Sequence, residues 1–289
     1  MAWRVRMISK LNRFGAIACV AIVAVLVVSG LLAFSTRSRA DAQSSLTVSL
    51  PPPVTDRIYG SPLARGRPIV VIDAGHGGRD PGATSGSGQV VEKDLTLALA
   101  RELRDDLVKR GRVRVAMTRD DDRYLTLDER AAVARRLDAA MFVSIHIDSA
   151  PNPLARGASV YSLSDVASDE EAARLAAKEN STDSDGADSG SVQGMLSDLA
   201  MRSQMSESAD LATRLVGKSA GRFELRPNPH RFASFHVLRR ADAPAVLFEA
   251  GYLSNADDEL LLRSPEHRSA MALALAQAIE TDIASRARH

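Results

Sequence analysis

Two histidines and two glutamates of this chain occupy positions where side chains could bind a metal ion and activate water. Two neutral imidazoles and one carboxylate leave Zn²⁺ with a net positive charge and with one coordination position open to water. A further carboxylate outside the metal's ligand set is then needed to take the water's proton and pass it to a leaving amine. His76, Glu92 and His146 are the candidate ligands, and Glu249 is the candidate proton carrier.

Each of these residues also has an ordinary structural interpretation. A lone histidine after a strand is more often a hydrogen-bonded structural residue. Glu92 precedes Lys93, where a helix is expected to begin, and an acid there interacts favourably with the helix dipole. Glu249 is harder to explain in this way, because it ends an apolar run in which an unpaired carboxylate is costly. Asp148 could orient His146 by accepting a hydrogen bond, or it could cap a loop.

The elements that must position these residues alternate between short apolar strands and longer helices. This alternation predicts an α/β fold with a twisted, largely parallel sheet flanked by helices. We expect strands at 69–73, 112–118, 139–147, 157–163, 235–239 and 244–250. We expect helices at 93–111, at 126–137, where Thr126 and Glu129 have capping-box spacing, and at 264–285.

The predicted strand ends explain how distant residues could form one site. Ligand sites in parallel sheets form at the carboxyl ends of the strands. His76 follows the first predicted strand, His146 ends the third and Glu249 ends the last. We therefore expect these side chains to share one rim of a single catalytic domain, residues 68–289.

Residues 164–222 interrupt the alternation. They begin with Ser168 and Glu171 at capping-box spacing, continue through a Ser/Asp/Gly-rich run and end in a helical stretch with methionines on its apolar face. We interpret them as an inserted helical segment. The methionine face could bind a partner or pack on the sheet, and packing is the commoner outcome. Arg119 and Arg130 could pair with neighbouring acids or contact substrate, and we favour pairing.

The N-terminus is an export segment. Six basic residues and one acid lie in residues 1–42, which also contain an apolar run and the small-residue sequence "ADA" before residue 43. We expect a cleaved signal peptide, with a membrane anchor as the alternative, followed by an extended linker at 43–67. The remaining chain has 31 basic and 35 acidic residues, a net of about −4, which gives no basic footprint for nucleic acid.

Five ordered motifs resemble those of the zinc-dependent N-acetylmuramoyl-L-alanine amidases of the AmiA/AmiB/AmiC type. They are "VVIDAGHGGRDPGA", "EKDLTLALARELRDDL", "VAMTRDDDRYLTLDERAAVAR", "FVSIHID" and "PAVLFEAGYLSN". The resemblance covers 69–285 and implies hydrolysis of the amide between N-acetylmuramic acid and the L-alanine of the stem peptide. It implies one zinc ion per chain on His76, Glu92 and His146, with Glu249 as the catalytic glutamate. Ile147 and Tyr252 depart from the commoner residues without removing a ligand.

The resemblance also implies a mode of regulation. In amidases of the cell-division type, an inserted helix covers the zinc site until a LytM-domain activator displaces it. Glu170, Glu171 and Glu179 occupy the corresponding position here. We expect one of them to block the open metal position, with a solvated acidic helix as the alternative. We further expect a monomeric, periplasmic enzyme from a Gram-negative bacterium. The resemblance implies that the enzyme acts in daughter-cell separation. We expect it to touch the membrane only through its N-terminus, if that segment is not cleaved.

Overall fold

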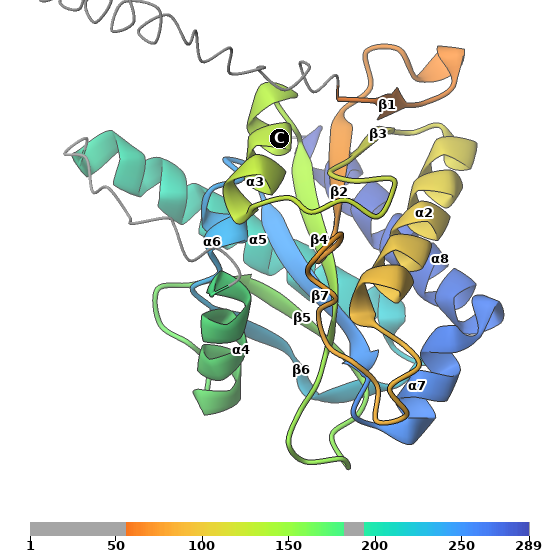
Figure 1. Ribbon diagram of the computed structural model, residues 1–289. Helices are drawn as coiled ribbons and strands as arrows, with labels where there is room; N and C mark the ends of the chain where they lie inside the picture. The colour runs from red at the N-terminus through yellow and green to blue at the C-terminus, as the bar shows by residue number, and fades with distance from the viewer. Residues whose placement is uncertain (1–55, 182–193, 289) are drawn as a thin grey trace, which may run out of the picture. The chain divides into compact units, whose positions relative to one another are not determined.

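A seven-stranded sheet with helices on both faces forms the body of the chain (Figure 1). The computed structural model describes residues 56–181 and 194–288, so the predicted signal peptide lies outside the described residues. The strands are β1 (Ile58–Tyr59), β2 (Ile69–Ala74), β3 (Arg114–Met117), β4 (Met141–Asp148), β5 (Ala158–Leu163), β6 (Leu225–Ala233) and β7 (Ala245–Tyr252). The helices are the 3₁₀ turn η2 (Pro62–Ala64), α2 (Glu92–Arg110), α3 (Leu127–Arg136), α4 (Glu170–Asn180), α5 (Gly194–Ser219), α6 (His236–Arg239), α7 (Ala256–Arg263) and α8 (Pro265–Arg286).

The centre of the sheet is parallel, as the apolar strands predict. The strand order is β1-β3-β2-β4-β7-β5-β6, and β3, β2, β4 and β7 run parallel to one another. β1 pairs antiparallel with β3 at one edge, while β5 and β6 pair parallel with each other and β5 runs antiparallel to β7. The α/β class is confirmed, and the sheet is mixed because its outer strands reverse direction.

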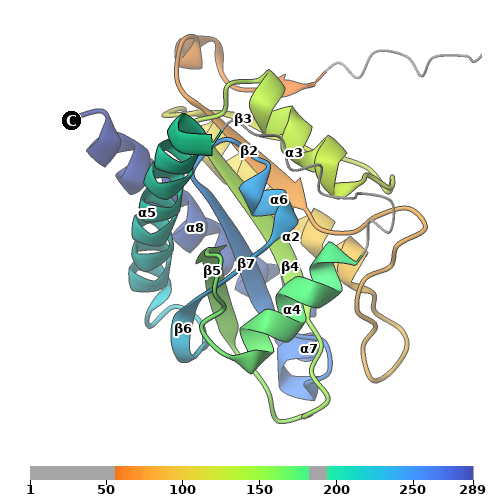
Figure 2. The same cartoon turned by 90° about the vertical axis from the view of Figure 1, so that its left-hand side faces the viewer.

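Two apolar layers cover the sheet. On one face α2, α5 and α8 pack against the strands, and on the other face α3, α4 and α6 do so (Figure 2). α2 buries the predicted leucine stripe of Leu95, Leu99, Leu103 and Leu107. Each fully buried leucine removes enough apolar surface from water to stabilise the fold by roughly 1.5–3 kcal/mol.

α5 belongs to the core, although it lies in the predicted insertion. Leu211 and Leu215 are fully buried among residues of α2, α8 and the sheet, and Met201 and Met205 pack at the edge of the other core cluster. The methionine-bearing helix therefore packs on the sheet. Met195 and Leu196, which also lie on the predicted apolar face, have side chains outside the described residues.

Three local expectations differ from the structure. Residues 236–239 form the helix α6 instead of a strand, and the strand β6 precedes it. The linker predicted at 43–67 ends earlier, because Ile58–Tyr59 pair with β3. α4 is capped by Asp169, whose side chain accepts from the Ala172 N–H, instead of by the expected capping box at Ser168.

Over residues 56–181 and 194–288, no helix combines the length and apolar character needed to cross a bilayer.

Candidate functional site

The carboxyl ends of the central strands bring the predicted ligands together. His76 lies just beyond β2 and His146 near the end of β4, while Glu92 begins α2. Glu249 on β7 is the register partner of His146 on β4. All four side chains are buried, so the expected rim exists as one cluster.

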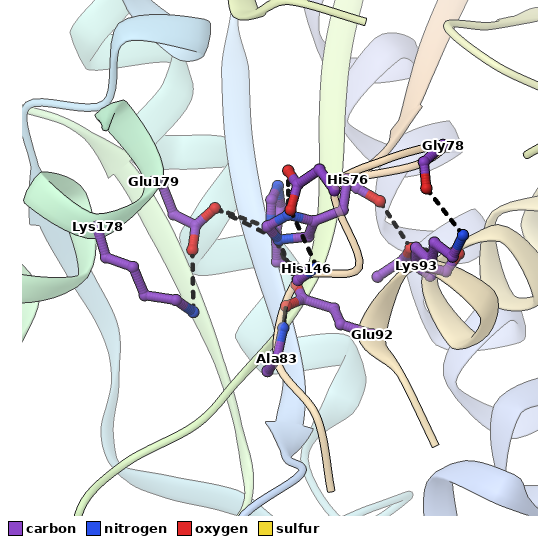
Figure 3. A network of polar contacts seen from close by, with 12 residues as sticks. His76, Gly78, Ala83, Glu92, Lys93, His146, Lys178 and Glu179 are labelled. Atoms are coloured by element: carbon purple, nitrogen blue, oxygen red, sulfur yellow. Dashed lines mark hydrogen bonds and ion pairs between the residues drawn. The ribbon is translucent and has the colours of Figure 1, made fainter. Parts of the chain in front are cut away.

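Two imidazole nitrogens face two carboxylate oxygens at the centre of this cluster (Figure 3). Glu92 Oε1 lies 3.0 Å from His76 Nε2 and 3.1 Å from His146 Nδ1. Glu179 Oε2, which comes from α4, lies 3.6 Å from His76 Nε2 and 3.3 Å from His146 Nδ1. The nitrogen and oxygen ligand atoms of His76, His146 and Glu179 all lie within 4.8 Å of one another.

The surroundings of His76 and Glu92 fix the orientation of their free atoms. Asp80 Oδ2 accepts from His76 Nδ1 at 2.8 Å, so that the neutral imidazole directs its lone pair on Nε2 to the cluster. Nε2 is buried and forms no hydrogen bond with the described residues. The Ala83 and Ile147 N–H groups donate to the two oxygens of Glu92 at 2.8 and 2.9 Å. Asp80 was not singled out from the sequence, although it follows His76 by four residues in the same loop.

Glycines allow the backbone to approach these side chains closely. A Cβ at Gly82, whose φ is +67°, would lie 2.5 Å from Glu92 Oε2 and 2.7 Å from Cδ2 of His76. A Cβ at Gly75 would lie 2.5 Å from Cε1 of His146. Contacts this short cannot be accommodated without moving the candidate ligands. The small residues of the loop after β2 are therefore a steric requirement of the cluster.

The electrostatics of the cluster favour a positive charge. Burial alone would lower the pKa of His76, but Glu92, Asp80 and Glu179 together raise that pKa to about 10. Burial opposes ionisation of Glu92, and His76 and His146 nevertheless hold the pKa of that carboxyl well below its usual range. A bound cation would meet the same electrostatic demand.

The donor set fits a divalent metal ion. Ligand atoms about 2.1 Å from a tetrahedral zinc ion lie about 3.4 Å apart, and the four nitrogen–oxygen separations of 3.0–3.6 Å bracket that value. The buried Nε2 of His76, without a hydrogen bond among the described residues, is the atom that such an ion would satisfy. The described residues thus contain a possible His–His–Glu metal site.

Glu249 carries a buried carboxyl that forms no hydrogen bond with the described residues. The residue is 1% exposed, and neither carboxylate oxygen is hydrogen-bonded to a described residue. Burial and the charges of Asp148, Glu92 and Glu179 raise its pKa well above the usual range. Burial also raises the pKa of Asp148 to about 6. Asp148 accepts from the neighbouring Ser149 N–H at 2.6 Å. This contact corresponds to the loop-capping role considered for Asp148, not to a hydrogen bond that orients His146.

α4 covers the cluster and supplies one of the three acids expected there. Glu179 is buried between the imidazoles and Lys178, whose Nζ lies 3.2 Å from Glu179 Oε1. Glu170 is exposed, and Glu171 pairs with arginines of β6. A cavity of about 10 Å³, room for about one water molecule, lies against His76, His146 and Glu179. α4 therefore lies over a water-sized space beside the two imidazoles.

Comparison with known proteins places the chain in one family. The model of a family described as N-acetylmuramoyl-L-alanine amidase matches residues 70–281. A protein of Neisseria meningitidis named N-acetylmuramoyl-L-alanine amidase AmiC is 36% identical over 220 residues, which cover 74% of this chain and 52% of that protein. AmiA of Escherichia coli is 33% identical over 234 residues, covering 78% of this chain and 80% of AmiA.

Solved structures agree with the sequence comparison. The catalytic domain of the amidase CwlV from Bacillus (Paenibacillus) polymyxa has a TM-score of 0.53 at 29% identity, covering 73% of this chain and 96% of that domain. AmiC2 of Nostoc punctiforme has a TM-score of 0.55 at 27% identity and covers 78% of this chain and 99% of its own. The chain spans about half the length of the AmiC relatives that it matches. With this fold and these matched residues, the chain belongs to the N-acetylmuramoyl-L-alanine amidase family.

Proposed function

We propose that this chain hydrolyses the amide bond between N-acetylmuramic acid and the L-alanine of the peptidoglycan stem peptide, with one zinc ion per chain. The observation that carries the proposal is the convergence of His76 Nε2 and His146 Nδ1 on Glu92 Oε1 at 3.0 and 3.1 Å. Membership of the amidase family supplies the substrate class.

The residues of the site divide into holding and proton-transfer roles. His76, His146 and Glu92 would hold the ion, and Asp80 would keep His76 in the tautomer that exposes Nε2. A bound zinc ion supplies a Lewis acid that polarises water and the amide carbonyl. Glu249 takes the proton of the attacking water at its carboxylate and delivers it to the departing nitrogen of L-alanine. Its position beside His146 in the register of β4 and β7, buried from solvent, suits a group that must hold a proton between these two steps.

We further propose that α4 inhibits the resting enzyme. Glu179 Oε2 faces both imidazole nitrogens, where its oxygen would occupy the coordination position that water needs. The small volume of the cavity beneath α4 supports the same proposal. The resemblance to cell-division amidases leads us to propose displacement of α4 by a LytM-domain activator, in the periplasm, during separation of daughter cells.

Digestion of purified cell-wall sacculi tests the proposed reaction. We expect wild-type protein to release intact stem peptides with free L-alanine amino termini and a chelator to stop the release. Glu249→Gln should retain one zinc ion per chain and lose activity by about 100-fold or more. Acetate as the product would indicate a polysaccharide deacetylase, and single amino acids would indicate a peptidase. The assay should be repeated in the Glu179→Gln background, so that slow turnover of an inhibited enzyme is not mistaken for a binding protein without activity.

A further inference from the structure

Two buried arginines surround the turn that presents His76. Three successive backbone carbonyls, those of Ala74, Gly75 and His76, accept hydrogen bonds from their guanidinium groups. Arg119 is fully buried and Arg130 is 4% exposed. Burial of two like charges side by side is costly, so the contacts that they make must offset that cost.

His76 has a backbone conformation that needs support. Its φ is +59°, in the left-handed region that residues other than glycine rarely adopt. Arg130 Nη2 donates to the His76 carbonyl at 2.7 Å, and Arg130 Nη1 donates to the Ala74 carbonyl at 2.7 Å. One guanidinium group thus spans the turn and fixes the peptide that follows His76.

Arg119 connects the His76 turn to the helix that carries Glu92. Its Nε donates to the Ala74 carbonyl at 2.9 Å, and its Nη2 donates to the carbonyls of Gly75 and Lys93, each at 2.8 Å. Lys93 follows Glu92 directly in the first turn of α2. Arg119 therefore sets the position of one candidate ligand relative to another.

A network of polar side chains below the turn holds Arg130 in place. Arg130 Nη1 lies 2.9 Å from Asp73 Oδ1, which also accepts from Thr118 Oγ1 at 2.7 Å, while Asp73 Oδ2 accepts from Ser144 Oγ at 2.6 Å. Burial alone would raise the pKa of Asp73, but Arg130 and the two hydroxyls lower it. The carboxylate is charged and fully satisfied, so the buried arginine is neutralised and fixed.

We infer that Arg119 and Arg130 are positioning residues of the metal centre, which fix His76 and Glu92 in the geometry that binds the ion. The inference deepens the proposed function and rests on it. Arginine is required at both positions because its planar fork serves three carbonyls from Arg130 and four from Arg119 at fixed angles, which a single ammonium group cannot do. In this arrangement each arginine acts through the backbone of a candidate ligand.

Lysine substitutions in the full chain test the inference through metal affinity. We expect Arg119→Lys and Arg130→Lys each to weaken Zn²⁺ binding by roughly 10–100-fold, measured by competition with a chromogenic chelator. Arg136→Lys is the matched control, because Arg136 lies on the same helix as Arg130 but pairs with Asp56 at the exposed side, at 2.7 and 2.8 Å. Its affinity should stay within about twofold of wild type. At saturating zinc the two test variants should lower kcat and leave KM unchanged.

The lysine variants could fail to fold, so a second test uses a variant that keeps both arginines. Thr118→Val removes one hydrogen bond to the same Asp73 oxygen that pairs with Arg130, and it should weaken Zn²⁺ binding by a smaller factor than Arg130→Lys. Wild-type zinc affinity in the folded variants would overturn the inference while leaving the proposed function intact. A wild-type chain that binds no zinc would instead refute the proposed function, and this inference with it.

Discussion

At the scale of single residues, the position of Glu179 on its helix decides which acid of α4 meets the imidazoles. Successive helical residues are rotated by about 100°, so Glu170 lies about 180° around the helix from Glu179. Glu170 accordingly faces solvent, whereas Glu179 faces the cluster. All three acids were candidates from the sequence for blocking the metal position. The orientation of α4 on the sheet decides which of them faces the imidazoles.

Glu179→Gln should raise the basal rate of stem-peptide release. The amide keeps the shape of the side chain but is a much weaker ligand than a carboxylate, so the fourth position would open to water. We expect an increase of about tenfold or more in sacculus digestion without any activator. Glu170→Gln is the control on the exposed face. Equal basal rates in the wild type and Glu179→Gln would refute inhibition by this residue.

The residue types of the site could be predicted from the sequence, whereas their supporting contacts could not. His76, His146 and Glu249 were recognisable because each follows or ends an apolar strand, and strand ends converge. The role of Asp80 depends on the left-handed backbone of His76, which turns Nδ1 to the loop. No pattern in one sequence specifies that turn.

At the scale of elements, α4 is fixed at both ends. At its C-terminus Asn180 donates to the Ser234 carbonyl and accepts from the His236 N–H, each at 2.8 Å. Near its N-terminus Glu171 pairs with Arg226 and Arg231 of β6, and Tyr252 donates to Glu171 at 3.0 Å. Tyr252, a departure from the commoner residue, thus contributes a hydroxyl that anchors α4.

The Glu171 ion pair should stabilise the fold in a pH-dependent way. Hydrogen bonding from Arg226 is the main cause that lowers the pKa of Glu171 from 4.5 to about 2. A depressed carboxylate pKa stabilises the folded state above the unfolded pKa and loses that effect as pH falls toward the folded one. The difference in free energy of unfolding between wild type and Glu171→Gln should therefore be constant above about pH 5 and shrink between pH 4.5 and 2. Urea unfolding measures it.

Glu170→Gln is again the matched control, and its free energy of unfolding should stay within about 0.5 kcal/mol of wild type. A difference between wild type and Glu171→Gln that does not change with pH would contradict an ion pair at this position.

The elements that sequence analysis missed lie where local patterns are ambiguous. β6 contains Pro227 and Pro229 and is mostly half-buried. Prolines are excluded from central strands but tolerated in an edge strand such as this one. The apolar residues Phe235, Val237 and Leu238 were expected in a strand, yet they bury against the sheet around the short helix α6. A run of that length does not distinguish the two states by periodicity.

At the scale of the whole molecule, the long predicted insertion separates into two parts with different roles. α4 lies over the site, while α5 completes the apolar layer formed with α2 and α8. The sequence did not separate them, because both follow the same break in the strand–helix alternation. Only packing distinguishes a helix that covers a site from one that supports the sheet.

Leu211→Ala should therefore destabilise the protein as a core substitution does. Leu211 is fully buried, and removal of its side chain should lower the free energy of unfolding by about 2–5 kcal/mol. Leu199→Ala, on the same helix and 66% exposed, should change it by less than about 0.5 kcal/mol. Similar small effects in both variants would show that α5 is not part of the core. Thermal or urea denaturation measures the difference.

The steric demand of Gly82 has a consequence for judging distant members of this family. A homologue could retain both histidines and both glutamates and still be inactive. A methyl group at position 82 would clash with the Glu92 carboxylate and the His76 ring and displace them from the geometry that holds the metal. An inventory of ligand residues would count that homologue as active. Inspection of this one glycine would identify it as a degenerate copy.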